Sequence, residues 1–283
     1  MNIQIMIGGI RFRVDSDCEI TVEKSLTPFL CVDEEDCDVV VKIICTREKV
    51  EKPEAEKYGE DLLLEYYLQK DQFWCLAKGS RGEYISKTVC DGSLKYLNCY
   101  LYWKHMESMN TLGSLLRLVP TCIILQRKGA LFFHASQIEV SGKGILFTAP
   151  SGTGKTTQAK LWKKYRDAKV ICNDRTLIRK EKTYGYPVDG SEPVRSGKIL
   201  PLGAIVLLEQ GEKNFVRKLT PKEALLKLFA QLLLIAWDSE GKLTIIEQLT
   251  ELLGKYPVYL LCCTPEESAV QCLEEQLKID GVI

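Results

Sequence analysis

The stretch that decides the fold is GILFTAPSGTGKTTQAKLW, residues 144–162. It opens with an apolar run typical of a buried strand and closes with a run typical of a helix. Between them, Ala149 through Thr156 meets the spacing [AG]-x-x-x-x-G-K-[ST], with Ala149 in place of the more usual first glycine. A strand, a P-loop (Walker A) pattern and a helix in this order predict a backbone that holds the phosphates of a nucleotide.

Each residue type in this loop has a physical reason to be there. Glycines let the backbone curl so that successive N–H groups face phosphate oxygens, and the start of a helix adds its positive dipole end. Lys155 supplies a charge for the β- and γ-phosphates, and Thr156 supplies a hydroxyl for Mg²⁺. The predicted cofactors are therefore ATP and Mg²⁺, and the predicted phosphate-binding residues are Ser151, Gly152, Thr153, Gly154, Lys155, Thr156 and Thr157. A ligand-free turn is disfavoured, because it does not need the order Gly-Lys-Thr at a helix start.

The next buried strand ends in an acidic residue. The run KVICNDRTLI, residues 169–178, places Asp174 after apolar residues. No glutamate follows it, which argues against a hydrolysing motor or transporter ATPase, and no N-K-x-D guanine-reading motif appears. Asp174 is predicted as a Mg²⁺ ligand or as the base for an incoming hydroxyl. An ordinary aspartate at a strand end remains the alternative.

The strand-like run before the loop contains His134, one of only two histidines in the chain. Residues 132–151, FFHASQIEVSGKGILFTAPS, predict a hairpin with a two-residue turn at Gly142-Lys143. In that register Thr148 faces Gln137, and Ser151 faces His134. We therefore expect His134 beside the phosphate loop, where it could touch a phosphate or the acceptor. A structural histidine is the alternative.

The chain of 283 residues is long enough for two domains. Short strands rich in β-branched and aromatic residues predict a β-rich domain over residues 1–108, with the charged run 47–61 as a solvated loop or short exposed helix. Residues 109–283 alternate strands and helices, which predicts an α/β domain. It begins with a helical stretch that Pro120 is expected to kink or divide and that Gly129 stops. Thr220 and Thr264, each followed by Pro and then by Glu three residues on, predict two capped helix starts.

Charge and cysteine content exclude several classes. Thirty-eight basic residues balance thirty-eight acidic ones, which leaves no electrostatic footprint for nucleic acid or an anionic membrane. No apolar run reaches the length of a membrane span. Twelve scattered cysteines without a C-x-x-C pair are expected to be free thiols in a reducing cytoplasm.

Together, the His-Ala-Ser strand, the hairpin, the loop and the Asp-bearing strand resemble the HPr kinase/phosphorylase family over roughly Leu131 to Leu277. The resemblance implies an HPr-kinase/PEP-carboxykinase-like P-loop domain, here preceded by a smaller β-rich domain. It also implies that Lys155 and Thr156 handle phosphates and Mg²⁺, and that Asp174 matches the second residue of the family's Asp-Asp pair. By the same resemblance, His134 matches the phosphate-side histidine.

Two departures from that family stand out. Asn173 replaces the first aspartate of the pair, which puts the metal geometry and any reverse phosphorylase activity in doubt. Residues 184–203 lack the Leu-Glu-x-Arg-Gly signature, although Arg195 and Lys198 could supply cations for a transferring phosphoryl group. Ordinary charges on a surface loop are the alternative for both.

These observations predict a cytoplasmic, HPr-kinase-like serine kinase that transfers the γ-phosphate of ATP to a hydroxyl of a peptide or protein. Its predicted catalytic residues are Asp174, His134, Lys155 and Arg195, and its predicted metal ligands are Thr156 and Asp174. A nucleotide-binding module without phosphotransfer and a small-molecule kinase or carboxykinase-like enzyme remain as alternatives. Neither nucleic acid nor a membrane is expected as a partner. Assembly into a homo-oligomer remains possible.

Overall fold

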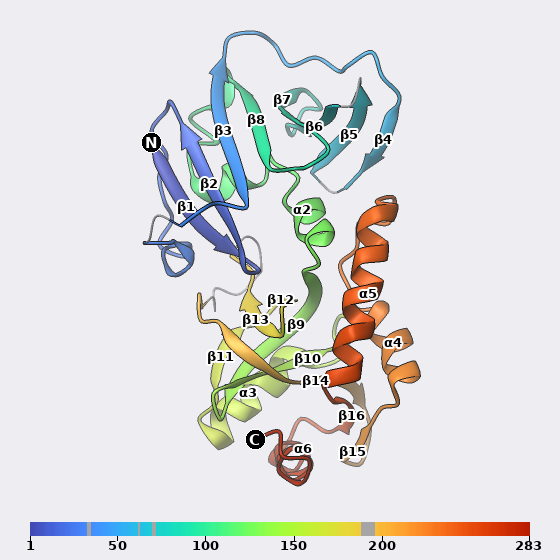
Figure 1. The fold of residues 1–283 in the computed structure, drawn as a ribbon. Helices are drawn as coiled ribbons and strands as arrows, with labels where there is room; N and C mark the ends of the chain where they lie inside the picture. The colour runs from blue at the N-terminus through green and yellow to red at the C-terminus, as the bar shows by residue number, and fades with distance from the viewer. Residues whose placement is uncertain (33–34, 62, 70–71, 188–195) are drawn as a thin grey trace. The chain divides into compact units, whose positions relative to one another are not determined.

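The computed structural model describes the whole chain except residues 33–34, 62, 70–71 and 188–195 (Figure 1). Its contacts divide it into two compact units, Met1–Ile124 and Leu125–Ile283. Each unit is built on an eight-stranded sheet, so the chain is a mixed α/β protein. The boundary expected from the sequence lies after residue 108, whereas by contacts residues 109–124 belong to the first unit.

The first unit is mostly strands, as the β-rich composition indicates. They are β1 (Asn2–Ile7), β2 (Ile10–Ser16), β3 (Val39–Thr46), β4 (Lys57–Glu60), β5 (Leu64–Gln69), β6 (Gln72–Lys78), β7 (Tyr84–Cys90) and β8 (Tyr96–Tyr102). Their order in the sheet is β1-β2-β3-β8-β7-β6-β5-β4 (Figure 1). Two short 3₁₀ turns (Thr27–Phe29 and Trp103–His105) and α1 (Leu112–Leu116) complete the unit.

One face of this sheet carries the apolar residues. Alternation along the strands buries Ile5, Phe12, Val41 and Cys99 completely or nearly so. The segment after the strands lies against this face, because the hydroxyl of Thr88 donates to the Leu118 carbonyl. The charged run 47–61 contains an edge strand, β4, in place of the expected loop or short helix, because residues 57–60 pair with β5.

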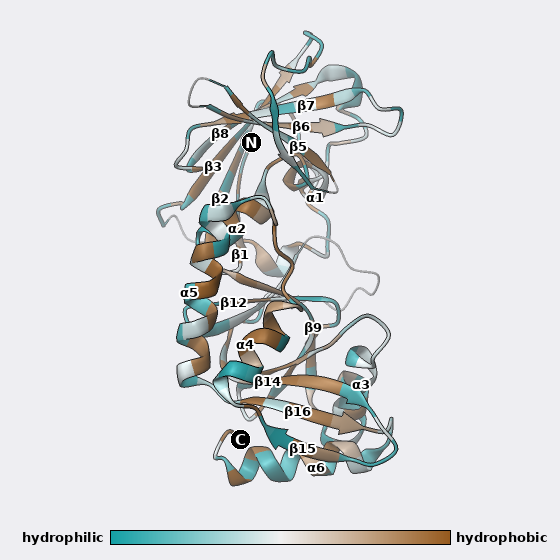
Figure 2. Cartoon of the chain, turned by 90° about the vertical axis from the view of Figure 1, so that its right-hand side faces the viewer, coloured by the Kyte–Doolittle hydropathy of each residue, from teal (hydrophilic) through white to brown (hydrophobic). Residues whose placement is uncertain are grey.

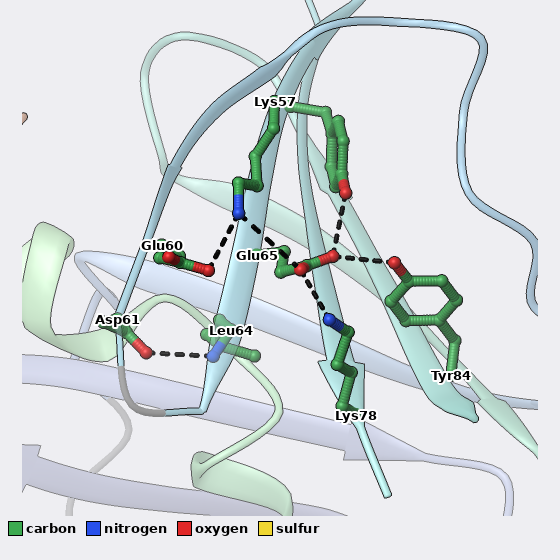
Figure 3. A network of polar contacts seen from close by, with 8 residues as sticks. Lys57, Glu60, Asp61, Leu64, Glu65, Lys78 and Tyr84 are labelled. Atoms are coloured by element: carbon green, nitrogen blue, oxygen red, sulfur yellow. Dashed lines mark hydrogen bonds and ion pairs between the residues drawn. The ribbon is translucent and has the colours of Figure 1, made fainter. Parts of the chain in front are cut away.

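A polar cluster on β5 joins three strands of this sheet. The carboxylate of Glu65 accepts hydrogen bonds from Lys78 (2.6 Å), from the Tyr84 hydroxyl (2.7 Å) and from the Tyr67 hydroxyl (2.8 Å) (Figure 3). Only 12% of the Glu65 side chain is exposed. Burial raises the pKa of Glu65, but the three donors outweigh it and bring the pKa down to about 2.

Replacing Glu65 with glutamine is expected to destabilise the first unit at pH 7 by about 3 kcal/mol, since the pKa is lowered from 4.5 to about 2. The stabilisation by the carboxylate is complete above pH 4.5 and is lost as the pH falls through 2. The difference between wild type and Glu65→Gln should therefore shrink on acidification. Hydrogen exchange of the β5 and β6 amides at pH 7 and pH 3 measures this difference in stability for the first unit alone.

Glu60→Gln is the matched control, because the Glu60 side chain is 61% exposed and pairs at the surface with Lys57. Its effect is expected to stay below about 1 kcal/mol. Equal protection of β5 in both variants would refute the stabilising role of the Glu65 cluster.

The second unit combines strands and helices, but they alternate only in part, because among the described residues β11 to β15 follow one another without a helix. The strands are β9 (Leu131–Val140), β10 (Lys143–Thr148), β11 (Lys169–Cys172), β12 (Arg175–Arg179), β13 (Lys182–Gly185), β14 (Leu200–Gln210), β15 (Phe215–Lys218) and β16 (Val258–Cys263). The helices are α3 (Lys155–Arg166), α4 (Pro221–Phe229), α5 (Ser239–Lys255) and α6 (Glu267–Ile279), and α2 (Thr121–Arg127) spans the division between the units.

The sheet of the second unit has the order β10-β9-β12-β13-β14-β16-β15, and β10 also pairs with β14. Strands β10, β14 and β16 run parallel, with Thr148 opposite Leu207 and Leu207 opposite Leu260. One core cluster joins the sheet to α4 and α5 through residues such as Leu228 and Leu249, and the other joins it to α3 and α6. In Figure 2 the strand β14 is largely hydrophobic and α5 alternates hydrophobic with hydrophilic residues, as expected for a helix with one buried face.

The predicted hairpin exists, but its register differs from the predicted one by two residues. Lys143 pairs with Val140, and Thr148 pairs with Ala135 instead of Gln137. The turn is formed by Ser141 and Gly142, both with positive φ (50° and 74°), as a type I′ hairpin turn requires. A slip of two residues keeps every side chain on its predicted face, because the period of a strand is two.

Helix boundaries follow the sequence in two of three places. Thr220 and Glu223 form the predicted capping box of α4, and Gly129, with φ +73°, follows α2 as expected. The predicted cap at Thr264 is wrong, because α6 begins at Glu267 and the Thr264 hydroxyl instead accepts a hydrogen bond from Asn214. Within the described ranges, no helix has both the length and the apolarity needed to cross a membrane.

Candidate functional site

The glycine-rich loop, residues 149–157, connects β10 to α3. Gly152 and Gly154 have φ of +80° and +111°, and Gly154 is the residue that precedes the helix. A side chain at Gly152 would meet no other atom within 4 Å, so this position faces open space. The backbone therefore adopts the curled conformation that the glycines predict, and the N-terminal end of α3 is directed at the same space.

The lysine of the loop is held inside it. Lys155 is buried, with 6% of its surface exposed, and its ammonium donates to the carbonyls of Ala149 (2.8 Å) and Pro150 (3.1 Å). Burial lowers the pKa of Lys155, and the nearby Asp174 acts in the opposite direction. The positive charge of Lys155 thus lies at the centre of the loop. Its ammonium can exchange the two carbonyl oxygens for the oxygens of a bound phosphate.

His134 and Asp174 come together on one side of the loop. β9 pairs with β12 so that His134 lies opposite Arg175, and the Asp174 carbonyl accepts from the Ala135 amide (3.0 Å). This pairing brings His134 Nε2 to 3.1 Å from Asp174 Oδ1. The other carboxylate oxygen, Oδ2, lies 3.6 Å from Nε of Arg175. The carboxylate is therefore placed between an imidazole and a guanidinium.

The electrostatic surroundings favour a neutral imidazole at pH 7. Burial lowers the pKa of His134, the charge of Lys155 lowers it further, and Asp174 partly opposes both. A neutral ring that hydrogen-bonds the carboxylate through Nε2 carries its proton on that nitrogen. His134 thus orients Asp174 without neutralising its charge.

These groups line one cavity of about 310 Å³, the phosphate-side cavity. Its walls are His134, Ser151, Gly152, Gly154, Lys155, Thr156, Thr157, Asn173 and Asp174. Of the predicted site residues, Thr153 lines a second, larger cavity instead. No group of three or more His, Cys, Asp or Glu side chains within the described part of the chain could hold a metal ion.

A family model matches residues 97–266, which is more than half of the chain and includes β9, the loop and Asp174. Its description is "SynChlorMet cassette protein ScmC". The chain belongs to the ScmC family.

Among solved structures, the HPr(Ser) kinase/phosphatase from Coxiella burnetii is similar to this ScmC-family chain with a TM-score of 0.30 and 13% identity. The match covers 53% of this chain and 93% of the other. No curated protein matches it.

Of the two cations predicted from residues 184–203 of this ScmC-family member, only Lys198 lies among the described residues, and it is not at the site. Arg195 lies outside the described residues. Lys198 pairs with Glu139, which lies on β9 at the end remote from His134. Arg175 is instead the described guanidinium beside Asp174. Arg175 could have been predicted from the sequence, because it directly follows Asp174 and begins β12.

Proposed function

We propose that the second unit is an ATP-dependent kinase, which transfers the γ-phosphate to a hydroxyl of a peptide or protein. The observation that carries the proposal is the convergence of Lys155, Thr156, His134 and Asp174 on one cavity at the start of α3. A buried ammonium and helix N–H groups suit phosphates, and a carboxylate 3.1 Å from an imidazole suits proton transfer.

The residues present fit a nucleotide with Mg²⁺. The open space at Gly152 leaves room for a phosphate against the backbone, and the cavity contains a hydroxyl at Thr156 and a carboxylate at Asp174. Mg²⁺ is commonly bound by one or two carboxylates together with substrate phosphates, so a larger protein ligand set is not required. When bound, Mg²⁺ would neutralise charge that develops on the phosphates.

The proposed reaction is a single in-line displacement. The acceptor hydroxyl oxygen attacks the γ-phosphorus, its proton passes to a carboxylate oxygen of Asp174, and the bond from the γ-phosphorus to the β–γ bridging oxygen breaks to release ADP. His134 holds the carboxylate in position through the 3.1 Å contact. Lys155 stabilises the negative charge on the transferring and leaving groups.

A nucleotide-binding module without transfer is the second candidate. It is favoured by Asn173, whose amide lines the cavity next to Asp174. The HPr kinases that the sequence resembles have a second carboxylate at this position. Asn173 is 8% exposed and lies between β11 and β12, where its carbonyl accepts from the Ser136 hydroxyl of β9. With one carboxylate in place of two, this site could bind phosphates without completing transfer.

Incubation of the full chain with γ-³²P-labelled ATP and Mg²⁺ distinguishes these functions. The acceptors to supply are the peptides and proteins encoded beside the gene. We expect ³²P to appear on a hydroxyl side chain, identified as phosphoserine or phosphothreonine after acid hydrolysis. ATP binding without labelling of any acceptor would favour the binding module, and labelling of a small metabolite alone would favour a small-molecule kinase.

A further inference from the structure

A second cavity, about 800 Å³ in volume, adjoins the loop on the side away from Asp174. We call it the leucine-lined cavity. It shares Ser151 and Gly152 with the phosphate-side cavity. Its remaining walls come from Pro150 and Thr153 of the loop, from the end of β14, from Leu260 of β16, from α4 and from the two residues Ala230 and Gln231 after α4. The two cavities therefore meet at the loop itself.

Strand order explains why the two cavities lie on opposite sides. β10, which leads into the loop, pairs with β9 on one side and with β14 on the other. His134 is on β9 and Asp174 is beside it, whereas Leu207 and Leu260 lie opposite each other in β14 and β16. Ligands of parallel α/β sheets bind outside the carboxyl ends of the strands.

The chemistry of the leucine-lined cavity suits an uncharged, flat group. Leu207 and Leu260 are 5% exposed and belong to the core behind the cavity, while Leu226 is 68% exposed at its edge. The only described ion pair among its walls joins Glu209 to Lys227 (3.1 Å), so the two charges cancel. A second phosphate or a charged peptide would find no net charge there. Apolar walls with a few polar groups are typical of small-molecule sites.

Two glutamines supply the polar groups. Gln210, at the end of β14, donates through Nε2 to the Gly152 carbonyl (3.4 Å), which connects the cavity to the loop. Gln231 lines the cavity, and its carbonyl accepts from the His134 amide (3.4 Å), so its backbone is fixed to β9. A glutamine amide can donate to and accept from the edge of an adenine at the same time.

We infer that the leucine-lined cavity holds the adenine base of the nucleotide, with Leu226 covering one face of the ring and Gln231 reading its edge. The inference rests on the proposed function. A triphosphate whose reacting end lies at Asp174 directs its other end across Ser151 and Gly152 into this cavity. The acceptor hydroxyl must then enter on the Asp174 side.

Calorimetric titration of the full chain with Mg²⁺ and either ATP or inorganic tripolyphosphate tests the assignment. The wild type should bind ATP at least tenfold more tightly than tripolyphosphate, because only ATP fills the leucine-lined cavity. Leu226→Asn should weaken ATP binding about three- to tenfold and leave tripolyphosphate binding unchanged. Leu243→Asn is the matched control, since Leu243 is 63% exposed on α5 and does not line the cavity.

The outcomes separate the two proposals. Equal affinity for ATP and tripolyphosphate, or equal ATP affinity in the Leu226 and Leu243 variants, would overturn the base assignment and leave the cavity to the acceptor. Failure of the wild type to bind either compound would instead overturn the phosphate site. Gln231→Ala should in addition reduce the preference for ATP over GTP, and an unchanged preference would remove Gln231 as the reading residue.

Discussion

Replacing Asp174 with asparagine is expected to lower the rate of phosphoryl transfer by a factor on the order of 10² or more, while ATP affinity changes only a few fold. Asparagine keeps the size of the side chain and an oxygen that can accept from His134 Nε2, now 3.1 Å away. It removes the negative charge that lies between His134 and Arg175. The side chain then cannot take a proton from the acceptor hydroxyl.

The rate is measured as transfer of ³²P from γ-labelled ATP to an acceptor that the wild type labels, and binding is measured by calorimetry on the same preparations. Asp167→Asn serves as the control, because Asp167 ends α3 with φ +52°, a conformation that asparagine tolerates well. If Asp174→Asn labels the acceptor as fast as Asp167→Asn, Asp174 is an ordinary residue of the β11–β12 turn. A Mg²⁺ titration of the variant separates a base from a metal-ordering carboxylate, since only loss of a ligand raises the Mg²⁺ requirement.

Replacing Lys155 with alanine is expected to weaken ATP binding by about 10- to 100-fold, which corresponds to the loss of a charge-assisted hydrogen bond of about 1.5–3 kcal/mol. Lys155 is the loop's buried cation, and its ammonium donates hydrogen bonds to the Ala149 and Pro150 carbonyls. The fold should survive, because the change also removes a buried charge and leaves α3 with a strong helix former at its first position.

Isothermal titration of Lys155→Ala with ATP and Mg²⁺ provides the test. Lys163→Ala is the matched control, because Lys163 is an exposed lysine of the same helix and lines neither cavity. Unchanged affinity in Lys155→Ala, with an intact circular dichroism spectrum, would rule out phosphate binding by the loop. Loss of binding in Lys155→Ala together with retained binding in Asp174→Asn would assign the two residues to binding and to chemistry.

The local elements of the second unit could be predicted from the sequence because their signals lie within a few residues. The loop and the start of α3 depend on Gly152, Gly154 and the residues directly around them. The capping box at Thr220 depends on a glutamate three positions later, and it is present. Hairpin formation also followed from local residues, but two adjacent turn positions were compatible with the sequence.

Features that depend on distant residues were not predictable in the same way. The predicted cap at Thr264 was wrong, because its hydroxyl accepts a hydrogen bond from Asn214, fifty positions earlier. β4 was missed because a polar segment forms a strand only when β5 offers it an edge. The leucine-lined cavity was missed because α4, the end of β14 and Leu260 of β16 are far apart in the sequence.

The sequence by itself determined that a strand, a curled glycine-rich loop and a helix follow one another, and it predicted His134 and Asp174 as the polar residues beside the loop. Only the tertiary structure decided that these two side chains lie 3.1 Å apart and that a second cavity opens on the other side of the loop. The physical reason is the range of the interactions. Backbone conformation and helix caps are set by neighbours in the chain, whereas the β9–β12 register and the position of α4 are set by packing between segments that the chain brings together only on folding.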